Sequence, residues 1–163
     1  MPMRSLLRRV PATASQDLTR IGLGAVMTFA GISHLTFARE EFRAQVPSWQ
    51  PFPEDLVVVG SGVAEIALGV SLIALPRYRR LTGVALAAFY VAVFPGNISQ
   101  YVEGIDAFGL DTDAKRLDRL FGQPLLIAAA LWGAGLSQRT RGSGQSGQSD
   151  HSEDPHTTTR SVG

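Results

Sequence analysis

The feature that most constrains this fold is a run of twenty residues, LVVVGSGVAEIALGVSLIAL at 56–75, with Glu65 as its single charge. A helix needs about 20 mostly apolar residues to cross the hydrocarbon core of a bilayer. Three further runs approach this length and composition, at residues 19–37, 81–101 and 120–136. None alternates with the period of two that a transmembrane β-strand requires. The sequence therefore predicts an all-α protein, an antiparallel bundle of four transmembrane helices.

A water-soluble helical bundle is the main alternative, and it requires a polar outer face on each helix. One face of 56–75 is instead aliphatic, and the opposite face holds the small and polar residues. The first face comprises Val59, Val63, Ile66, Ala67, Val70 and Ile73, and the second Ser61, Gly62, Glu65, Leu68, Gly69 and Leu72. This arrangement favours a lipid environment. The run at 19–37 also exceeds the apolar core of a cleaved signal peptide, about 7–15 residues, so we expect an uncleaved span.

The charged residues predict the topology. Basic residues concentrate before residue 21, in the hairpin at 76–80 and in the C-terminal tail, whereas the loops at 38–55 and 102–119 hold nine of the fourteen acidic residues. Because cytoplasmic loops are enriched in Lys and Arg, we expect a multi-pass protein of the cell membrane with both termini cytoplasmic. The chain then divides into an N-terminal segment (1–18), a membrane domain (19–136) and a polar tail (137–163) that we expect to be disordered.

The composition excludes several classes of function. The chain has no cysteine, and therefore no disulfide or thiol redox pair. Its net charge of +1 gives no basic surface for nucleic acid. Two of its three histidines, His151 and His156, lie in the polar tail without further ligands beside them, so no metal site is expected. No nucleophile and base occur together, so we do not expect an enzyme that acts alone.

Glu65 is the most informative polar residue of the predicted membrane domain. A carboxylate at mid-bilayer costs at least about 2.5 kcal/mol, so it needs a partner, a proton or water. Tyr90 reaches a similar depth from the opposite side, at a rise of about 1.5 Å per residue. We therefore expect the Tyr90 hydroxyl to donate a hydrogen bond to Glu65. We also expect the acid to be functional, because an amide would fasten helices without the charge penalty.

A second polar layer is expected nearer the outer surface. His34 lies near the outer end of the first run, Asn97 near that of the third and Gln123 near the start of the fourth. Pro95 lacks an amide hydrogen and so frees the carbonyl of Val91. For the two amides, fastening helices together is as good an explanation as function. The sequence thus predicts a ligand-binding or proton-handling pocket formed by Glu65, Tyr90, His34, Asn97, Gln123 and Pro95.

Four glycines, Gly31, Gly62, Gly69 and Gly83, are expected to be positions where helices pack closely. In the loop at 38–55, residues 38–46 are predicted to form a short amphipathic helix. The proline-rich segment after it places Trp49 and Phe52 at the height of the lipid head groups.

Six motifs occur in a fixed order between residues 22 and 132: GISHLTF, VPSWQPFP, SGVAEIALG, LPRYRR, AVFPGNISQY and RLFGQPLLIAAALW. This order resembles the DoxX-like family of small bacterial membrane proteins. The resemblance implies a four-helix bundle. It marks the same residues as the depth argument, namely His34, Glu65, Pro95, Asn97 and Gln123.

The DoxX-like family takes its name from a subunit of a thiosulfate–quinone oxidoreductase, and its members are often linked to redox or stress complexes. The resemblance therefore implies a membrane subunit with a quinone as its possible cofactor and a soluble redox partner. Two other interpretations stay open: a non-catalytic assembly protein, and a small proton-coupled transporter that would need to form a homo-oligomer.

Overall fold

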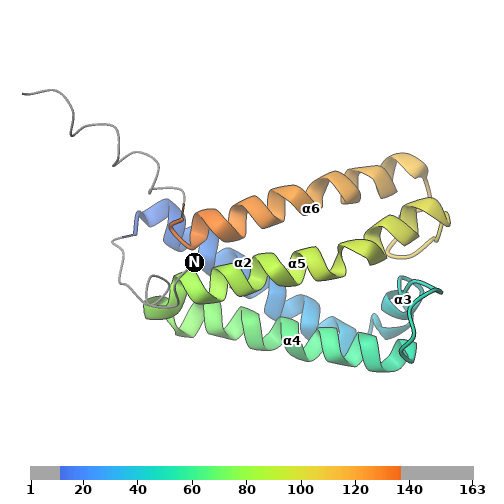
Figure 1. Cartoon of the computed structure of the whole chain (residues 1–163), viewed down its shortest axis with the longest axis horizontal. Coiled ribbons are helices and arrows are strands. Elements are labelled where there is room, and N and C mark those ends of the chain that lie inside the picture. Colours follow the sequence, from blue (N-terminus) through green and yellow to red (C-terminus); the bar gives the residue numbers. More distant parts are fainter. Residues whose placement is uncertain (1–11, 137–163) are drawn as a thin grey trace, which may run out of the picture.

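The computed structural model describes residues 12–136, which form four long α-helices, one short α-helix and one 3-10 turn (Figure 1). The elements are α2 (Ala14–Leu35), α3 (Arg39–Arg43), α4 (Glu54–Ala74), η1 (Pro76–Tyr78), α5 (Arg79–Val102) and α6 (Asp113–Gly133). The long helices run antiparallel, and the predicted all-α bundle is confirmed. The polar tail, and with it the prediction of disorder, lies outside the described residues.

Two of the helices begin earlier than the hydropathy runs suggest, because polar residues cap them. Thr13 and Gln16 form a capping box, so α2 begins at Ala14. The hydroxyl of Thr112 accepts from the amide of Lys115, so α6 begins at Asp113. The short helix expected at 38–46 is present as α3.

Three helices of the described region are long and apolar enough to cross a membrane. They are α2, α4 and the segment of 76–102 that contains α5. The predicted fourth span, at 120–136, is not among them, because the first two turns of α6 are charged and α6 ends at Gly133. Three of the four predicted spans thus have the length and composition that a crossing needs, and a crossing by α6 stays a prediction.

Consecutive long helices pair with each other, α2 with α4 and α5 with α6 (Figure 1). A Cβ atom on Gly31 would lie 2.4 Å from the carbonyl oxygen of Gly62, and one on Gly69 would lie 2.6 Å from that of Gly24. A Cβ atom on Gly83 would meet α6 in the same way. The prediction that these glycines are close-packing positions is confirmed.

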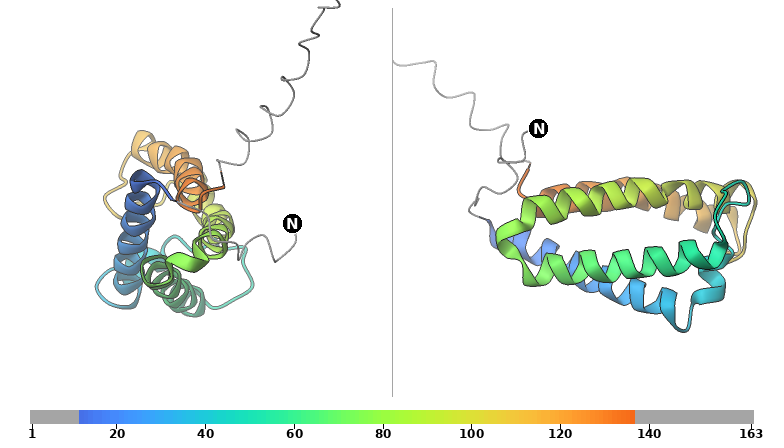
Figure 2. Two further views of the ribbon diagram at one scale, coloured as in Figure 1. Left: turned by 90° about the vertical axis from the view of Figure 1, so that its left-hand side faces the viewer. Right: turned by 60° about the horizontal axis from the view of Figure 1, so that its bottom comes forward.

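The faces of α4 are as predicted for a helix in lipid. Its buried residues include Gly62, Glu65 and Gly69, and exposed aliphatic side chains such as Val63 and Val70 lie on the other side. Figure 2 shows the four long helices around one axis, with α3 and the long loops at one end of the bundle.

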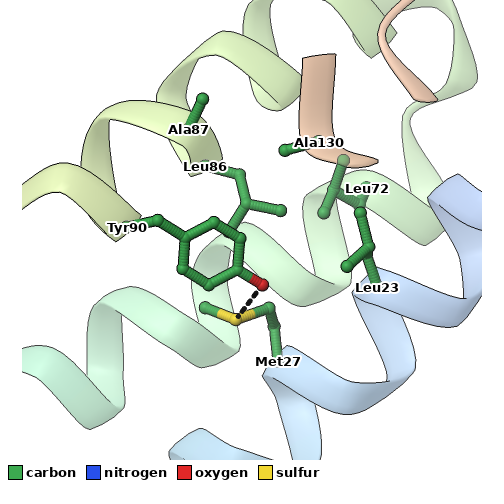
Figure 3. Packing of buried hydrophobic residues seen from close by; sticks show 7 residues of the cluster. All are labelled: Leu23, Met27, Leu72, Leu86, Ala87, Tyr90 and Ala130. Carbon is green, nitrogen blue, oxygen red and sulfur yellow. Dashed lines mark hydrogen bonds between the residues drawn. The ribbon is translucent and has the colours of Figure 1, made fainter. Parts of the chain in front are cut away.

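The apolar core fills the half of the bundle away from α3. It contains Leu23 and Met27 from α2, Leu72 from α4, Leu86, Ala87 and Tyr90 from α5, and Ala130 from α6 (Figure 3). Beyond the core, two buried arginines bind the ends of other helices. Arg20 donates to the carbonyls of Leu72 and Ile73 at the end of α4, and Arg79 donates to that of Gly133 at 2.8 Å. Asp17 lies within ion-pair distance of both arginines. The orphan carbonyls of two helix C-termini are thus satisfied at this end.

Candidate functional site

A cavity of about 1230 Å³ occupies the other half of the bundle, between the α2–α4 pair and the α5–α6 pair. All four long helices contribute to its wall, and so do α3 and the loop after it, at the end of the bundle where α3 lies. The six residues singled out in the sequence all line this cavity: His34, Glu65, Tyr90, Pro95, Asn97 and Gln123. The structure therefore brings the predicted set together, although not with the predicted pairing.

Glu65 meets His34, not Tyr90. The Glu65 Oε2 atom lies 2.6 Å from His34 Nδ1, and both side chains are buried. The direction of approach is not that of an aligned hydrogen bond, and Nδ1 also lies 3.1 Å from the carbonyl oxygen of Ala30. At 2.6 Å from an imidazole nitrogen, the buried Glu65 Oε2 atom makes a close acid–imidazole contact but no hydrogen bond of ordinary geometry.

The predicted hydrogen bond between Tyr90 and Glu65 is wrong. The Tyr90 hydroxyl donates to the sulfur of Met27 at 3.2 Å, within the apolar core (Figure 3). The glycine contacts explain the difference. Gly31 and Gly62 bring α2 and α4 together, so that His34 lies against Gly62. Glu65 follows Gly62 by one helical turn on α4 and therefore lies beside His34. Helix α5, which carries Tyr90, packs only loosely on α4.

An amide ladder joins α5 to α6 along the cavity wall. Asn97 Nδ2 donates to Gln123 Oε1 at 3.0 Å, and Gln123 Nε2 donates to the carbonyl oxygen of Tyr90 at 2.7 Å. The predicted common level of Asn97 and Gln123 is therefore confirmed. Helix α5 continues through Pro95, which has no amide hydrogen to donate to the carbonyl of Val91. Gln123 Nε2 donates to the preceding carbonyl, that of Tyr90.

Arg119 extends the amide ladder toward the end of the bundle where α3 lies. Its Nε donates to Asn97 Oδ1 at 3.2 Å, and its Nη2 donates to Gln45 Oε1 at 3.1 Å. Gln45 Nε2 in turn donates to Gln100 Oε1 at 3.2 Å. Arg119 precedes the apolar stretch of α6, and burial lowers the pKa of its guanidinium group.

Two phenylalanine rings lie in series between His34 and Arg119. The ring of His34 lies 3.3 Å from that of Phe42 between centroids, and Phe42 contacts Phe108 edge-on at 4.6 Å. The guanidinium of Arg119 lies over Phe108, 5.4 Å from the ring centroid. Phe108 has a φ of 56°, and its amide donates to Glu41 Oε2 at 2.8 Å. A left-handed conformation is unusual for an aromatic residue, and this hydrogen bond helps to hold it.

The sequence analysis missed five residues of this site: Gln45, Gln100, Arg119, Phe42 and Phe108. Helical spacing was the signal for two of them. Arg119 lies one turn before Gln123 on α6, and Gln100 lies one turn after Asn97 on α5. Of the other three, Phe42 lies on the five-residue helix α3, and Gln45 and Phe108 lie in loops. Such short or irregular segments have too little periodicity to indicate which side chains turn inward.

Metal ligation is not what the described residues offer. Within residues 12–136, no three His, Asp or Glu side chains come together as a metal ion would require. The cavity is lined instead by an acid–imidazole pair, four amide side chains, a few charged side chains at one end and a largely apolar wall. Such a wall, with a few convergent polar groups, is typical of a small-molecule site.

Comparison of the chain with curated proteins finds no match, and comparison with solved structures finds none either. Residues 23–134 match a family described as a domain of unknown function (DUF8561). No match to the DoxX-like family accompanies it, so that resemblance stays a prediction from the motifs. Because the match covers all four long helices and more than half of the chain, the protein belongs to this DUF8561 family.

Proposed function

We propose that the protein is a membrane subunit that binds a lipid-soluble molecule with carbonyl or phenolic oxygens, of the quinone class, for a redox or stress-related complex. The observation that carries this proposal is the buried Glu65–His34 pair, 2.6 Å apart, on the wall of a cavity of about 1230 Å³. The volume exceeds the 300–1000 Å³ or so that is typical of sites for drug-sized ligands, so a substituted ring with part of its tail has room.

The chemistry of the wall suits such a ligand. A quinone carbonyl accepts hydrogen bonds, and an imidazole N–H can donate one. Reduction of a quinone takes up two protons with two electrons, and a carboxyl group or an imidazole beside the ligand can supply or accept a proton. The chain has no cysteine to carry electrons, so electrons would come from a partner protein. The likeness of the motifs to the DoxX-like family supports the same assignment.

The position of the cavity favours entry from the bilayer. Its wall includes the side chains of Val26 on α2 and Leu125 on α6, which are 59% and 72% exposed on the bundle surface. A molecule dissolved in the hydrocarbon would reach the Glu65–His34 pair without crossing water. With α2, α4 and α5 as spans, α6 would be the fourth helix of a bundle with both ends of the chain on the cytoplasmic side.

A non-catalytic assembly protein is the second candidate. The observation that favours it is the amide ladder, because Asn97 and Gln123 satisfy each other and join two helices without any ligand. The two candidates differ in what they require of Glu65. Binding of a ligand at the pair requires the carboxyl group, whereas helix fastening by the ladder does not involve it.

The test is quinone binding to the full chain, purified in a mild detergent. Trp132 is replaced by phenylalanine, so that Trp49 on the cavity wall is the remaining fluorophore, and a short-tailed ubiquinone analogue is titrated as quencher. We expect saturable quenching that weakens about tenfold in Glu65→Gln and in His34→Gln, the loss of one charge-assisted hydrogen bond. Glu54→Gln, at the exposed start of α4, is the matched control and should bind normally. Quenching that stays linear in the wild type refutes the proposal. Saturable binding that is equal in all variants refutes the role of the pair.

A further inference from the structure

We infer that the outer part of the cavity is an anion subsite, in which Arg119 binds the carboxylate or phosphate head group of an acidic amphiphile. This site is separate from the Glu65–His34 pair and does not depend on the quinone proposal. The rings of Phe42 and Phe108 lie in series between His34 and Arg119.

The fully buried arginines of the described region are each neutralised by a carboxylate. Arg20 and Arg79 both lie within ion-pair distance of Asp17, and Arg116 contacts Asp106 and Asp113. Each of these cations thus has at least one carboxylate beside it. A desolvated charge is unfavourable unless it is paired, so this is the expected arrangement.

Arg119, which is half-buried, differs from these three arginines. No carboxylate within residues 12–136 lies within 4.0 Å of its guanidinium group, and its two hydrogen-bond acceptors are the neutral amide oxygens of Asn97 and Gln45. Two of its five N–H groups make these bonds, and the side chain lines the cavity. A half-buried cation without a counter-charge therefore borders a space large enough for a ligand.

The neighbouring charges leave this cation available. Lys115 also lines the cavity, but its ammonium group is paired with Asp111 at 2.7 Å. Asp118 lines the cavity as well, and it is exposed on the surface of α6. Glu41, the carboxylate bound to the Phe108 amide, uses one oxygen in that hydrogen bond. The guanidinium of Arg119 is thus the basic group through which the cavity can bind a negatively charged oxygen.

The rest of the wall identifies the body of the ligand as apolar. Below Arg119 the cavity is bordered by Val93 and Phe89 on α5 and by Leu126 on α6. A ligand with its anionic head group at Arg119 and its hydrocarbon body deeper in the cavity would match both the charged end and the apolar wall. Arginine suits this role because its planar fork binds both oxygens of a carboxylate or phosphate.

The experiment again uses Trp49 as reporter, in the full chain with Trp132→Phe. Dibrominated stearic acid is compared with its methyl ester, which has the same chain but no charge. In separate nanodiscs, dibrominated phosphatidylglycerol is compared with dibrominated phosphatidylcholine, so that a free carboxylate is distinguished from a lipid phosphate. We expect the anionic member of at least one pair to quench at about tenfold lower concentration or more, as for a hydrogen bond to a charged group.

Arg119→Gln should abolish this preference, and Arg119→Lys should keep part of it. Arg77→Gln, an exposed arginine at the opposite end of the bundle, is the matched control. Added salt should reduce the preference in the wild type, a measurement that stands even if Arg119→Gln does not fold. Equal quenching by charged and uncharged probes in the wild type, or a preference that survives in Arg119→Gln, overturns the inference. Saturable quinone binding that persists in Arg119→Gln would leave the proposed function standing when this inference fails.

Discussion

The glycine contacts between α2 and α4 lead to a prediction whose size can be worked out from the structure. In Gly31→Ala the new Cβ atom would lie 2.4 Å from the carbonyl oxygen of Gly62, 2.7 Å from Ile66 Cγ1 and 2.9 Å from Ile66 N. Two of these three neighbours are backbone atoms of another helix, so no side-chain rotation relieves the overlap.

The expected loss of stability follows from that overlap. An ordinary contact of a Cβ atom begins at 3.4 Å, so the two helices must separate by about 1 Å at this point. Overpacking of this kind costs about 1–3 kcal/mol, and the better helix propensity of alanine returns at most about 1 kcal/mol. We therefore expect the free energy of unfolding to fall by about 1–2 kcal/mol. The separation would also lengthen the contact between His34 and Glu65.

The assay is unfolding of the detergent-solubilised protein, followed by circular dichroism. Two glycines provide matched controls. Gly22 on α2 and Gly60 on α4 have no atom within 4 Å of an added Cβ, so alanine there should leave stability unchanged or raise it. Equal stability of Gly31→Ala and Gly22→Ala would refute the assignment of this interface as the contact that fixes the helix register.

Three further predictions concern the site and the topology. A double-mutant cycle with Glu65→Gln and His34→Gln should give a coupling energy of about 1–3 kcal/mol in the free energy of unfolding, and additive effects would contradict the 2.6 Å pair. Gln123→Leu removes two interhelical hydrogen bonds and should lower stability by about 1 kcal/mol, at about 0.6 kcal/mol for each, as measured by the same unfolding assay. Because the chain has no cysteine, Phe52→Cys should react with an impermeant maleimide in intact cells and Arg77→Cys only after permeabilisation; the reverse pattern would invert the predicted topology.

Much of the fold was predictable because hydrophobic length is a strong constraint in a membrane. The run at 56–75 has one face of small and polar residues, and that face is buried in α4 as expected. The start of α6 was not predictable from hydropathy, since a capped, charged turn after Thr112 extends the helix beyond its apolar part. Because of the same charges, α6 is not one of the helices that are long and apolar enough to cross a membrane.

The candidate site was predictable as a set of residues and not as a set of contacts. Counting depth placed Glu65 and Tyr90 at one level, but depth does not say which helices are neighbours. The register of α2 on α4 decides the pairing, and it depends on where Gly31 meets Gly62. Gln45 and Phe108 could not be identified in this way, because they lie in segments whose conformation depends on tertiary contacts.

The arginines at the far end of the bundle have a mechanical consequence. Arg20 ties α2 to the last carbonyls of α4, and Arg79 ties α5 to that of α6, with Asp17 bridging both. These contacts join the α2–α4 pair to the α5–α6 pair at the end of the bundle away from α3. A rotation of one pair against the other about this point would displace the opposite end of the bundle, around Phe42 and Arg119, the most.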